Sequence, residues 1–171
     1  MASENDKDDL RQYLTFMLAG EVYAIDVASI KEVLGVPKIT RVPRMPAFMS
    51  GVINLRGNVI PVLDLCLKFG LEPTARTIDT SIIVTELTNI FADNDVETFT
   101  VGIFSDLVLN VISIAPSQIE PPPKIGISID TSFITGMGRV DESFVIMLNI
   151  DKILSEKELL LAKPGEVADD N

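Results

Sequence analysis

Hydrophobic and polar residues alternate over many short segments of the chain, which is the pattern of half-buried β-strands. Residues 12–18 alternate in this way, a turn follows at Ala19-Gly20-Glu21, and residues 22–26 complete a predicted hairpin. Residues 52–65 predict a second hairpin that turns at Gly57-Asn58. The remaining predicted strands lie at residues 81–87, 98–104, 107–114 and 144–148, and the acidic segment 89–97 is predicted to be a loop. Many short strands at this spacing favour small β-barrels or a sandwich.

Helices are predicted to be few and short. Apolar residues at helical spacing, followed by Gly35, predict a helix over residues 27–34. Residues 46–50 predict a single turn that Pro46 opens. Ser155 and Glu158 form a capping-box pattern before Leu159-Leu-Leu161, which predicts a last helix that ends at Pro164-Gly165.

Composition narrows the possible functions. The chain has 171 residues, 47% of them hydrophobic, with no histidine and one cysteine. It can therefore bury a core of one-domain size, but it offers no imidazole base, no His-containing zinc site and no disulfide framework. The polar, acidic N-terminus is unlike a secretory signal, and no apolar run is long enough to span a membrane. We therefore expect a cytoplasmic protein without direct membrane insertion.

The net charge of −11 is distributed unevenly. Residues 12–80 contain six acidic and seven basic side chains, whereas residues 81–162 contain twelve and four. Basic residues gather between Lys31 and Arg56, with Glu32 as their only acidic neighbour. This distribution predicts that the basic stretch borders one binding face and that the acidic half, with its loop, faces elsewhere. A nucleic-acid partner is not expected, because the chain is acidic and carries no tryptophan and two tyrosines for stacking on bases.

Catalytic chemistry has one weak candidate. Asp79 and Asp130 each begin an Asp-Thr-Ser triplet, and two such carboxylates could form the acid dyad of a small all-β hydrolase. The glycine that normally turns the backbone beneath such a dyad is absent, and Asp-Thr-Ser is also ordinary turn chemistry. Cys66 lies among apolar neighbours, which indicates an inert packing residue. No cofactor is expected.

Arg56, in Asn54-Leu-Arg-Gly57, is the strongest binding candidate. At a hairpin end its guanidinium fork would anchor a carboxylate of a partner. The apolar residues near it could either form a surface that accepts a helix or fill the core, and the sequence leaves both open. These residues are Ile30, Val33, Met45, Phe48 and Met49.

Together these segments resemble the CheW family of bacterial chemotaxis coupling proteins, over residues 12–162. The most specific segment is Phe48-Met-Ser-Gly-Val-Ile-Asn-Leu-Arg-Gly57, followed by Ile60-Pro-Val-Leu-Asp-Leu65. The other matching segments are Tyr13-Leu-Thr-Phe16, Gly20-Glu-Val-Tyr-Ala-Ile-Asp26, Ile30-Lys-Glu-Val33, Gly102-Ile-Phe-Ser-Asp106, Val108, Val111, Gln118-Ile-Glu-Pro121, Phe133-Ile-Thr-Gly136 and Met147-Leu-Asn-Ile-Asp-Lys-Ile-Leu154.

The resemblance implies a fold and a role. It implies a mainly β protein of two five-stranded SH3-like barrels packed together. The charged segments outside the resemblance, residues 1–11 and 163–171, are predicted from their composition to be solvated tails. The resemblance also implies a non-enzymatic adaptor that couples the cytoplasmic tips of methyl-accepting receptors to the histidine kinase CheA, whose regulatory domain it would contact, and that joins other CheW-like domains in rings at membrane receptor arrays. The implied receptor-binding residues are Val27, Ile30, Glu32, Gly51 and Arg56. The implied kinase-binding residues are Val108, Val111, Glu120, Lys124 and Ile125.

The chain also departs from the family pattern. Cys66 stands where arginine is usual, Asn149 replaces a frequent aspartate, and the 89–97 segment is long and acidic for the family. None of these positions lies in the most specific segment. They leave open a dedicated, non-flagellar chemosensory system, for pili or surface sensing, as the setting in which the adaptor works.

Overall fold

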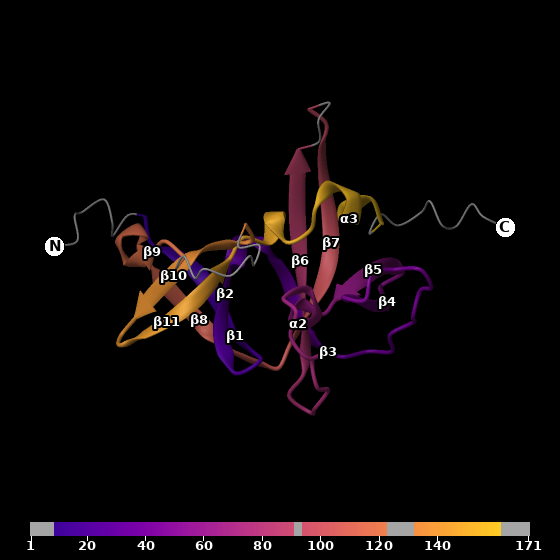
Figure 1. Ribbon diagram of the computed structural model, residues 1–171, viewed down its shortest axis with the longest axis horizontal. Helices are drawn as coiled ribbons and strands as arrows, with labels where there is room; N and C mark the ends of the chain where they lie inside the picture. Colours follow the sequence, from indigo (N-terminus) through magenta and orange to yellow (C-terminus); the bar gives the residue numbers. More distant parts are fainter. Residues whose placement is uncertain (1–8, 91–93, 123–131, 162–171) are drawn as a thin grey trace.

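The protein folds into two curled β-sheets that pack side by side, each forming a half-barrel (Figure 1). The computed structural model describes residues 9–90, 94–122 and 132–161. The expectation of a mainly β protein of two barrels packed together is confirmed, although the two half-barrels have six and five strands instead of five each. In the described part of the chain, no helix is long and apolar enough to cross a membrane.

The first sheet has six strands in the order β8-β1-β2-β11-β10-β9. Its strands are β1 (Arg11–Leu18), β2 (Glu21–Asp26), β8 (Leu107–Ile114), β9 (Ile119–Glu120), β10 (Ile134–Val140) and β11 (Ser143–Leu148). It is assembled from both ends of the chain, because β11 pairs in parallel with β2. A bulge in the pairing of β1 with β8 is held by Thr15. Its hydroxyl accepts the Asn110 amide at 3.2 Å and can donate to the backbone or the side-chain oxygen of Asn110, at 2.8 and 2.7 Å.

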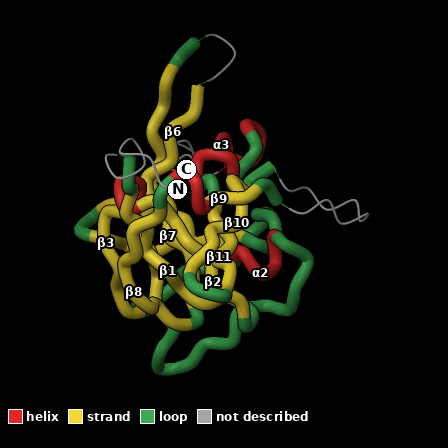
Figure 2. Tube along the Cα trace, turned by 90° about the vertical axis from the view of Figure 1, so that its left-hand side faces the viewer, coloured by secondary structure: helices red, strands yellow, loops and turns green. Residues whose placement is uncertain are grey.

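The second sheet has five strands in the order β3-β6-β7-β5-β4, all from the middle of the chain. Its strands are β3 (Ile30–Gly35), β4 (Met49–Leu55), β5 (Asn58–Leu63), β6 (Ser81–Ile90) and β7 (Val96–Ser105). The outer part of the β6–β7 hairpin projects beyond the rest of the molecule in both views (Figures 1 and 2). The short helices are η1 (Val27–Ser29), α2 (Leu65–Lys68), η2 (Pro116–Gln118), η3 (Ile150–Lys152) and α3 (Glu156–Leu161).

The main hydrophobic core lies between the two sheets and contains side chains from both. Phe16 of β1 and Ile25 of β2 are fully buried with Ile83 of β6 and Ile103 of β7. Leu159 of α3 also belongs to this cluster, so the C-terminal helix closes over it. Because the apolar area removed from water is shared between the sheets, each half-barrel is stabilised by the other.

The two sheets follow the same internal plan. In each, a hairpin with a glycine bulge (β4–β5 or β10–β11) is joined to a second hairpin by a parallel pair. A Cβ atom on Gly51 would lie 2.4 Å from the Thr40 carbonyl oxygen, and one on Gly136 would lie 2.6 Å from the Glu120 carbonyl oxygen. Both positions therefore require glycine for a close backbone approach, which explains why Phe-x-x-Gly occurs at both places in the sequence.

The helix predicted over residues 27–34 is wrong beyond its first turn. Only Val27–Ser29 form a 3₁₀ turn, capped by the Asp26 side chain, and Ile30–Gly35 form strand β3. Half-buried and exposed residues alternate along β3, and the spacing that suggested a helix arises from the turn preceding a strand. Pairing with β6 decides the conformation here, because β-branched residues also suit a strand.

Three further predictions need correction. Residues 46–50 make only a tight turn before β4 begins at Met49, in which the Met49 amide donates to the Pro46 carbonyl at 2.9 Å. The β4–β5 hairpin turns at Arg56-Gly57, one residue earlier than predicted. The two ends of the predicted 89–97 loop are strand, because Asn89 pairs with Glu97 and Ile90 with Val96. The loop was predicted because polar residues dominate the outer part of the β6–β7 hairpin, which we call the β6–β7 ribbon and which is exposed on one face.

The capping box before the last helix is confirmed. The Ser155 amide donates to the Glu158 carboxylate at 2.9 Å, and the Glu158 amide donates to the Ser155 hydroxyl at 3.2 Å. The predicted end of this helix at Pro164-Gly165 lies outside the described residues. The sequence pattern did not predict strands β9 and β10 or helix α2.

Candidate partner-binding site

Curling of the five-stranded sheet brings Glu32 and Arg56 together. They lie on β3 and after β4, the two edges of that sheet, which are far apart in strand order. Arg56 and Gly57 both have positive φ, 51° and 87°, so they form a tight two-residue turn. The Asn54 side chain accepts the Gly57 amide at 2.8 Å and fixes this turn. Arg56 is thus presented by the turn itself.

Arg56 and Glu32 form a two-point ion pair. The guanidinium donates from Nη1 and Nη2 to the two carboxylate oxygens, at 2.7 and 3.0 Å. These hydrogen bonds lower the pKa of Glu32, and the same interaction raises the pKa of Arg56. The Arg56 side chain is 72% exposed, so most of it stays accessible to a partner.

A hollow of about 600 Å³ opens beside this pair, and we call it the Arg56 hollow. Strands β3 to β7 all contribute to its wall. Val59, which is 53% exposed, and Leu55 give it an apolar side, while Lys31 and Asn58 give it a polar one. A concave site with both apolar and polar residues in its wall can surround a side chain or one side of a helix of a partner protein, which a flat surface cannot do.

The other predicted receptor-binding residues lie in different surroundings. Val27 and Ile30 are half-buried against the main core and lead along η1 and β3 to Glu32. Gly51 is buried under the loop that carries Thr40 and offers no exposed contact. Of the five residues, Glu32 and Arg56 are therefore in direct contact. Val27 and Ile30 lie on η1 and β3, which lead to Glu32, and Gly51 has a packing role.

The expected separation of charge between two faces is wrong at this site. Lys31 forms an ion pair with Glu86 of β6 at 3.6 Å, and Glu97 of β7 lines the Arg56 hollow. The acidic ribbon therefore stands next to the basic stretch. Halves of the sequence do not correspond to faces of the molecule, because the strands of the two halves pair with each other.

A second exposed surface lies on β8, the edge strand of the six-stranded sheet. Val111 is 51% exposed, whereas Val108 is half-buried against the main core. Two apolar residues that the sequence analysis did not select, Leu107 and Leu109, are exposed on the same strand. We call Leu107, Leu109 and Val111 the β8 stripe. Their alternation along one predicted strand was the signal that could have identified them.

Glu120, the third kinase-binding candidate, lies on β9 at the opposite edge of the same sheet. Its carboxylate accepts two hydrogen bonds from Arg139, at 2.6 and 3.1 Å. Lys124 and Ile125 lie outside the described residues. Of the described candidates, Val108 and Val111 therefore lie on one edge strand of this sheet and Glu120 on the other.

The hydrolase hypothesis gains no support from the described residues. Asp79 is exposed in a turn, where its amide donates to the Thr77 hydroxyl at 3.1 Å, and Asp130 lies outside the described residues. Cys66 is buried, and burial raises the pKa of its thiol. Both observations are ordinary for structural residues. Among the described residues, no three His, Cys, Asp or Glu side chains gather in a way that could hold a metal ion.

Comparison with known proteins identifies the family. The family model of the CheW-like domain matches residues 12–158. The chain is 34% identical over 151 residues to the chemotaxis protein CheW of Klebsiella aerogenes, covering 88% of this chain and 86% of the relative. The chain belongs to the CheW family. A second relative is the chemotaxis protein CheW of Treponema pallidum, which is 33% identical and covers 89% of the chain and 86% of the relative.

The fold agrees with a solved CheW structure. The crystal structure of the scaffolding protein TtCheW from Thermoanaerobacter tengcongensis matches with a TM-score of 0.72 and 32% identity, over 86% of this chain and 94% of that one. At this similarity the two-sheet architecture is that of a CheW domain. The matched region contains both the Arg56 hollow and the β8 stripe.

Proposed function

We propose that this chain is a non-enzymatic adaptor that couples methyl-accepting chemotaxis receptors to the histidine kinase CheA. One observation carries the proposal: the exposed, two-point Arg56–Glu32 pair stands beside a 600 Å³ hollow, within a domain of the CheW family. The names of relatives that match over most of the chain support chemotaxis as the setting, and they favour it over a dedicated pilus system. The proposal places the protein in the cytoplasm, recruited to receptor arrays.

In this proposal the receptor tip, a helical hairpin, binds at the Arg56 hollow. Apolar side chains of a receptor helix contact Val27, Ile30 and Val59, which supply affinity by burial. Arg56 then reaches a carboxylate of the receptor with the part of its guanidinium that Glu32 leaves exposed, and this contact sets the register. Glu32 holds the arginine in one rotamer beforehand, which lowers the entropy lost on binding.

The regulatory domain of the kinase would bind a different surface. The β8 stripe offers apolar side chains on a strand whose outer edge pairs with no other described strand, which suits contact with another small barrel. Because the receptor and kinase surfaces lie on different sheets, one chain can hold both partners at once. A chain with two such surfaces can also be a link in a ring of CheW-like domains and kinase regulatory domains.

The test is a charge reversal with a compensating partner. Arg56→Glu should reduce receptor-dependent activation of the kinase about tenfold or more, because the variant places a carboxylate where the receptor's carboxylate must bind. Combined with Glu32→Arg, it should restore part of the activation, because the arginine then comes from the neighbouring position. The measurement is ATP-dependent autophosphorylation of the kinase, reconstituted with receptor-containing membranes and the purified chain.

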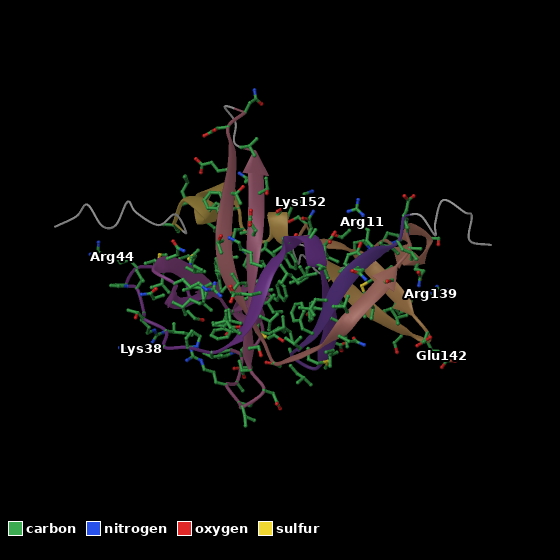
Figure 3. The ribbon with its side chains drawn as sticks, turned by 180° about the vertical axis from the view of Figure 1, so that it is seen from behind. Arg11, Lys38, Arg44, Arg139, Glu142 and Lys152 are labelled. Carbon is green, nitrogen blue, oxygen red and sulfur yellow. The ribbon has the colours of Figure 1, made fainter. Side chains whose placement is uncertain are left out.

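Lys152→Glu is the matched control, because Lys152 is an exposed base on η3 that does not line the Arg56 hollow (Figure 3). It makes the same change in net charge and should leave activation within about twofold of the unsubstituted chain. Full activation by the Arg56→Glu variant, with its unfolding temperature unchanged, would contradict the assignment of this hollow.

A further inference from the structure

The connection from β3 to β4 carries cations that have no partner among the described residues. Residues 33–63 contain four basic side chains and no acidic one. Of these, Arg56 pairs with Glu32, but Lys38, Arg41 and Arg44 take part in no ion pair within the described part of the chain. Lys38 and Arg44 lie at the end of the molecule opposite to Arg139 and Glu142 (Figure 3).

Arg41 and Arg76 both line a hollow of about 460 Å³, which we call the Arg41–Arg76 hollow. It shares no lining residue with the Arg56 hollow. Its wall also contains the apolar side chains of Ile39, Ala47, Leu67, Pro73 and Phe104. The one acidic residue in the wall is Asp64, which is 4% exposed. Its carboxylate already accepts the Cys66 and Thr74 amides and the Thr74 hydroxyl, at 2.8–3.1 Å.

The fold fixes the backbone beside Arg41 and the side chain of Arg76. Arg41 follows Thr40, whose backbone makes a two-bond bridge with Val52 at 2.8 and 2.9 Å. The Arg76 guanidinium lies over the Phe104 ring, 5.1 Å from its centroid. The Arg76 guanidinium is therefore pre-positioned at a concave, partly apolar site whose wall also contains Arg41. The one carboxylate in that wall, Asp64, is committed to backbone and hydroxyl groups.

We infer that this hollow binds an acidic segment of a partner protein, in which carboxylates reach Arg41 and Arg76 while an apolar side chain enters between them. Each guanidinium group can bind a carboxylate through two parallel hydrogen bonds, so a hollow lined by two arginines suits an acidic segment. The concave shape favours a protein segment over a membrane, because a flat lipid surface cannot enter the hollow and reach its apolar wall. Arg44 and Lys38, on the same connection, add attraction at longer range.

The probe is a fluorescein-labelled hexaglutamate peptide with one central leucine, measured by fluorescence anisotropy at low salt. The unsubstituted chain should bind it at one site, and Arg41→Gln with Arg76→Gln should weaken binding about tenfold or more, because two charge-assisted contacts are lost. Arg11→Gln with Lys152→Gln makes the same change in net charge elsewhere and should change the affinity less than about twofold. Arg41→Lys with Arg76→Lys should give an intermediate loss, since the charge remains but the fork does not.

Three results would overturn the inference. The first is that hexaglutamate does not bind, or binds the Arg41→Gln/Arg76→Gln variant as well as the unsubstituted chain. The second is displacement of the peptide by millimolar inorganic phosphate, which would indicate a small-anion site. The third is binding of phosphatidylglycerol vesicles that the same double variant abolishes, which would assign the surface to a membrane. Arg56→Glu should leave peptide binding within about twofold after correction for net charge, so this result is separable from the test of receptor coupling.

Discussion

At the scale of single residues, positions that a sequence pattern marks for one purpose can serve another. Gly51 belongs to the most specific family segment and was predicted to bind the receptor, yet a Cβ atom there would lie 2.4 Å from a backbone oxygen. Arg56 was predicted to extend from the end of a strand, yet it occupies the turn with a positive φ of 51°. In both cases the backbone conformation is decisive, and it depends on strands that are distant in sequence.

We expect Gly51→Ala to destabilise the protein by about 2 kcal/mol or more, because the added methyl group collides with the Thr40 backbone, which the Val52 bridge holds in place. Gly35→Ala is the control, since nothing lies within 4 Å of its Cβ position, and it should change stability by less than about 0.5 kcal/mol. Urea denaturation followed by circular dichroism measures both. Equal stability of the two variants would show that the loop moves aside without cost.

At the scale of elements, the C-terminal helix α3 is attached to the five-stranded half through α2. The Lys68 ammonium of α2 contacts the Glu158 carboxylate at 2.6 Å and lies 4.5 Å from the centroid of the Phe48 ring. Burial alone would raise the pKa of Glu158, but hydrogen bonds from Lys68 and Ser155 outweigh it and lower that pKa. The ion pair therefore fixes a helix that follows the six-stranded sheet onto an element of the other sheet.

This lowered pKa predicts how stability depends on pH. The folded protein holds the Glu158 proton less tightly than the unfolded chain does. The contribution to stability is therefore complete above the ordinary glutamate pKa of 4.5 and is lost as pH falls through the lower pKa of the folded state. Glu158→Gln should therefore be less stable than the unsubstituted chain at pH 7, and the difference should shrink below about pH 4. Thermal unfolding between pH 7 and pH 3 measures this. A difference that stays constant across the range would mean that Glu158 acts by packing alone.

The β8 stripe belongs to the same scale. Leu109→Glu should weaken binding of full-length kinase about tenfold or more, because a charge replaces an apolar contact in a desolvated interface. Stability should change by less than about 1 kcal/mol, since Leu109 is already 42% exposed. Val96→Glu, on the projecting β6–β7 ribbon, is the control and should bind the kinase normally. Analytical ultracentrifugation of the mixture distinguishes the two, and unimpaired assembly by Leu109→Glu would place the kinase elsewhere.

At the scale of the whole molecule, the two half-barrels cannot be separated along the chain. The six-stranded sheet is made from the first and last strands, and the five-stranded sheet is the segment between them. Their shared core contains Phe16 from one sheet and Ile103 from the other, each with no exposed surface. A substitution in one sheet therefore removes contacts from the other.

We expect the molecule to unfold in a single cooperative transition. Both tyrosines, Tyr13 and Tyr23, lie in the six-stranded sheet and no tryptophan is present, so tyrosine fluorescence reports that sheet while far-UV circular dichroism reports both. The two signals should change together in urea. Phe16→Ala should lose about 3–5 kcal/mol of stability, and its two signals should still change together. Val96→Ala, at a 58% exposed position, should match the unsubstituted chain. Separate transitions would show that the half-barrels fold independently.

The sequence by itself determined the local strand structure, the last helix and the family. Strands β1, β2, β5 and β8 follow from alternation, and the capping box at Ser155 and Glu158 follows from a contact between residues three apart. Such features could be predicted because their causes lie within a few residues of each other. The Arg56 segment could be selected as a binding candidate for the same reason, since its residue types are visible in one stretch.

Only the tertiary structure decided which residues meet. Residues 30–35 form a strand because β6 pairs with them, and the acidic ribbon stands beside Lys31 because β6 and β7 extend past that pairing. The Arg56–Glu32 pair joins residues that are 24 positions apart in the chain, and the Arg41–Arg76 hollow joins residues that are 35 positions apart. Their physical cause is the curling of the sheet around the shared core, which depends on apolar burial summed over the whole molecule and leaves no local mark in the sequence.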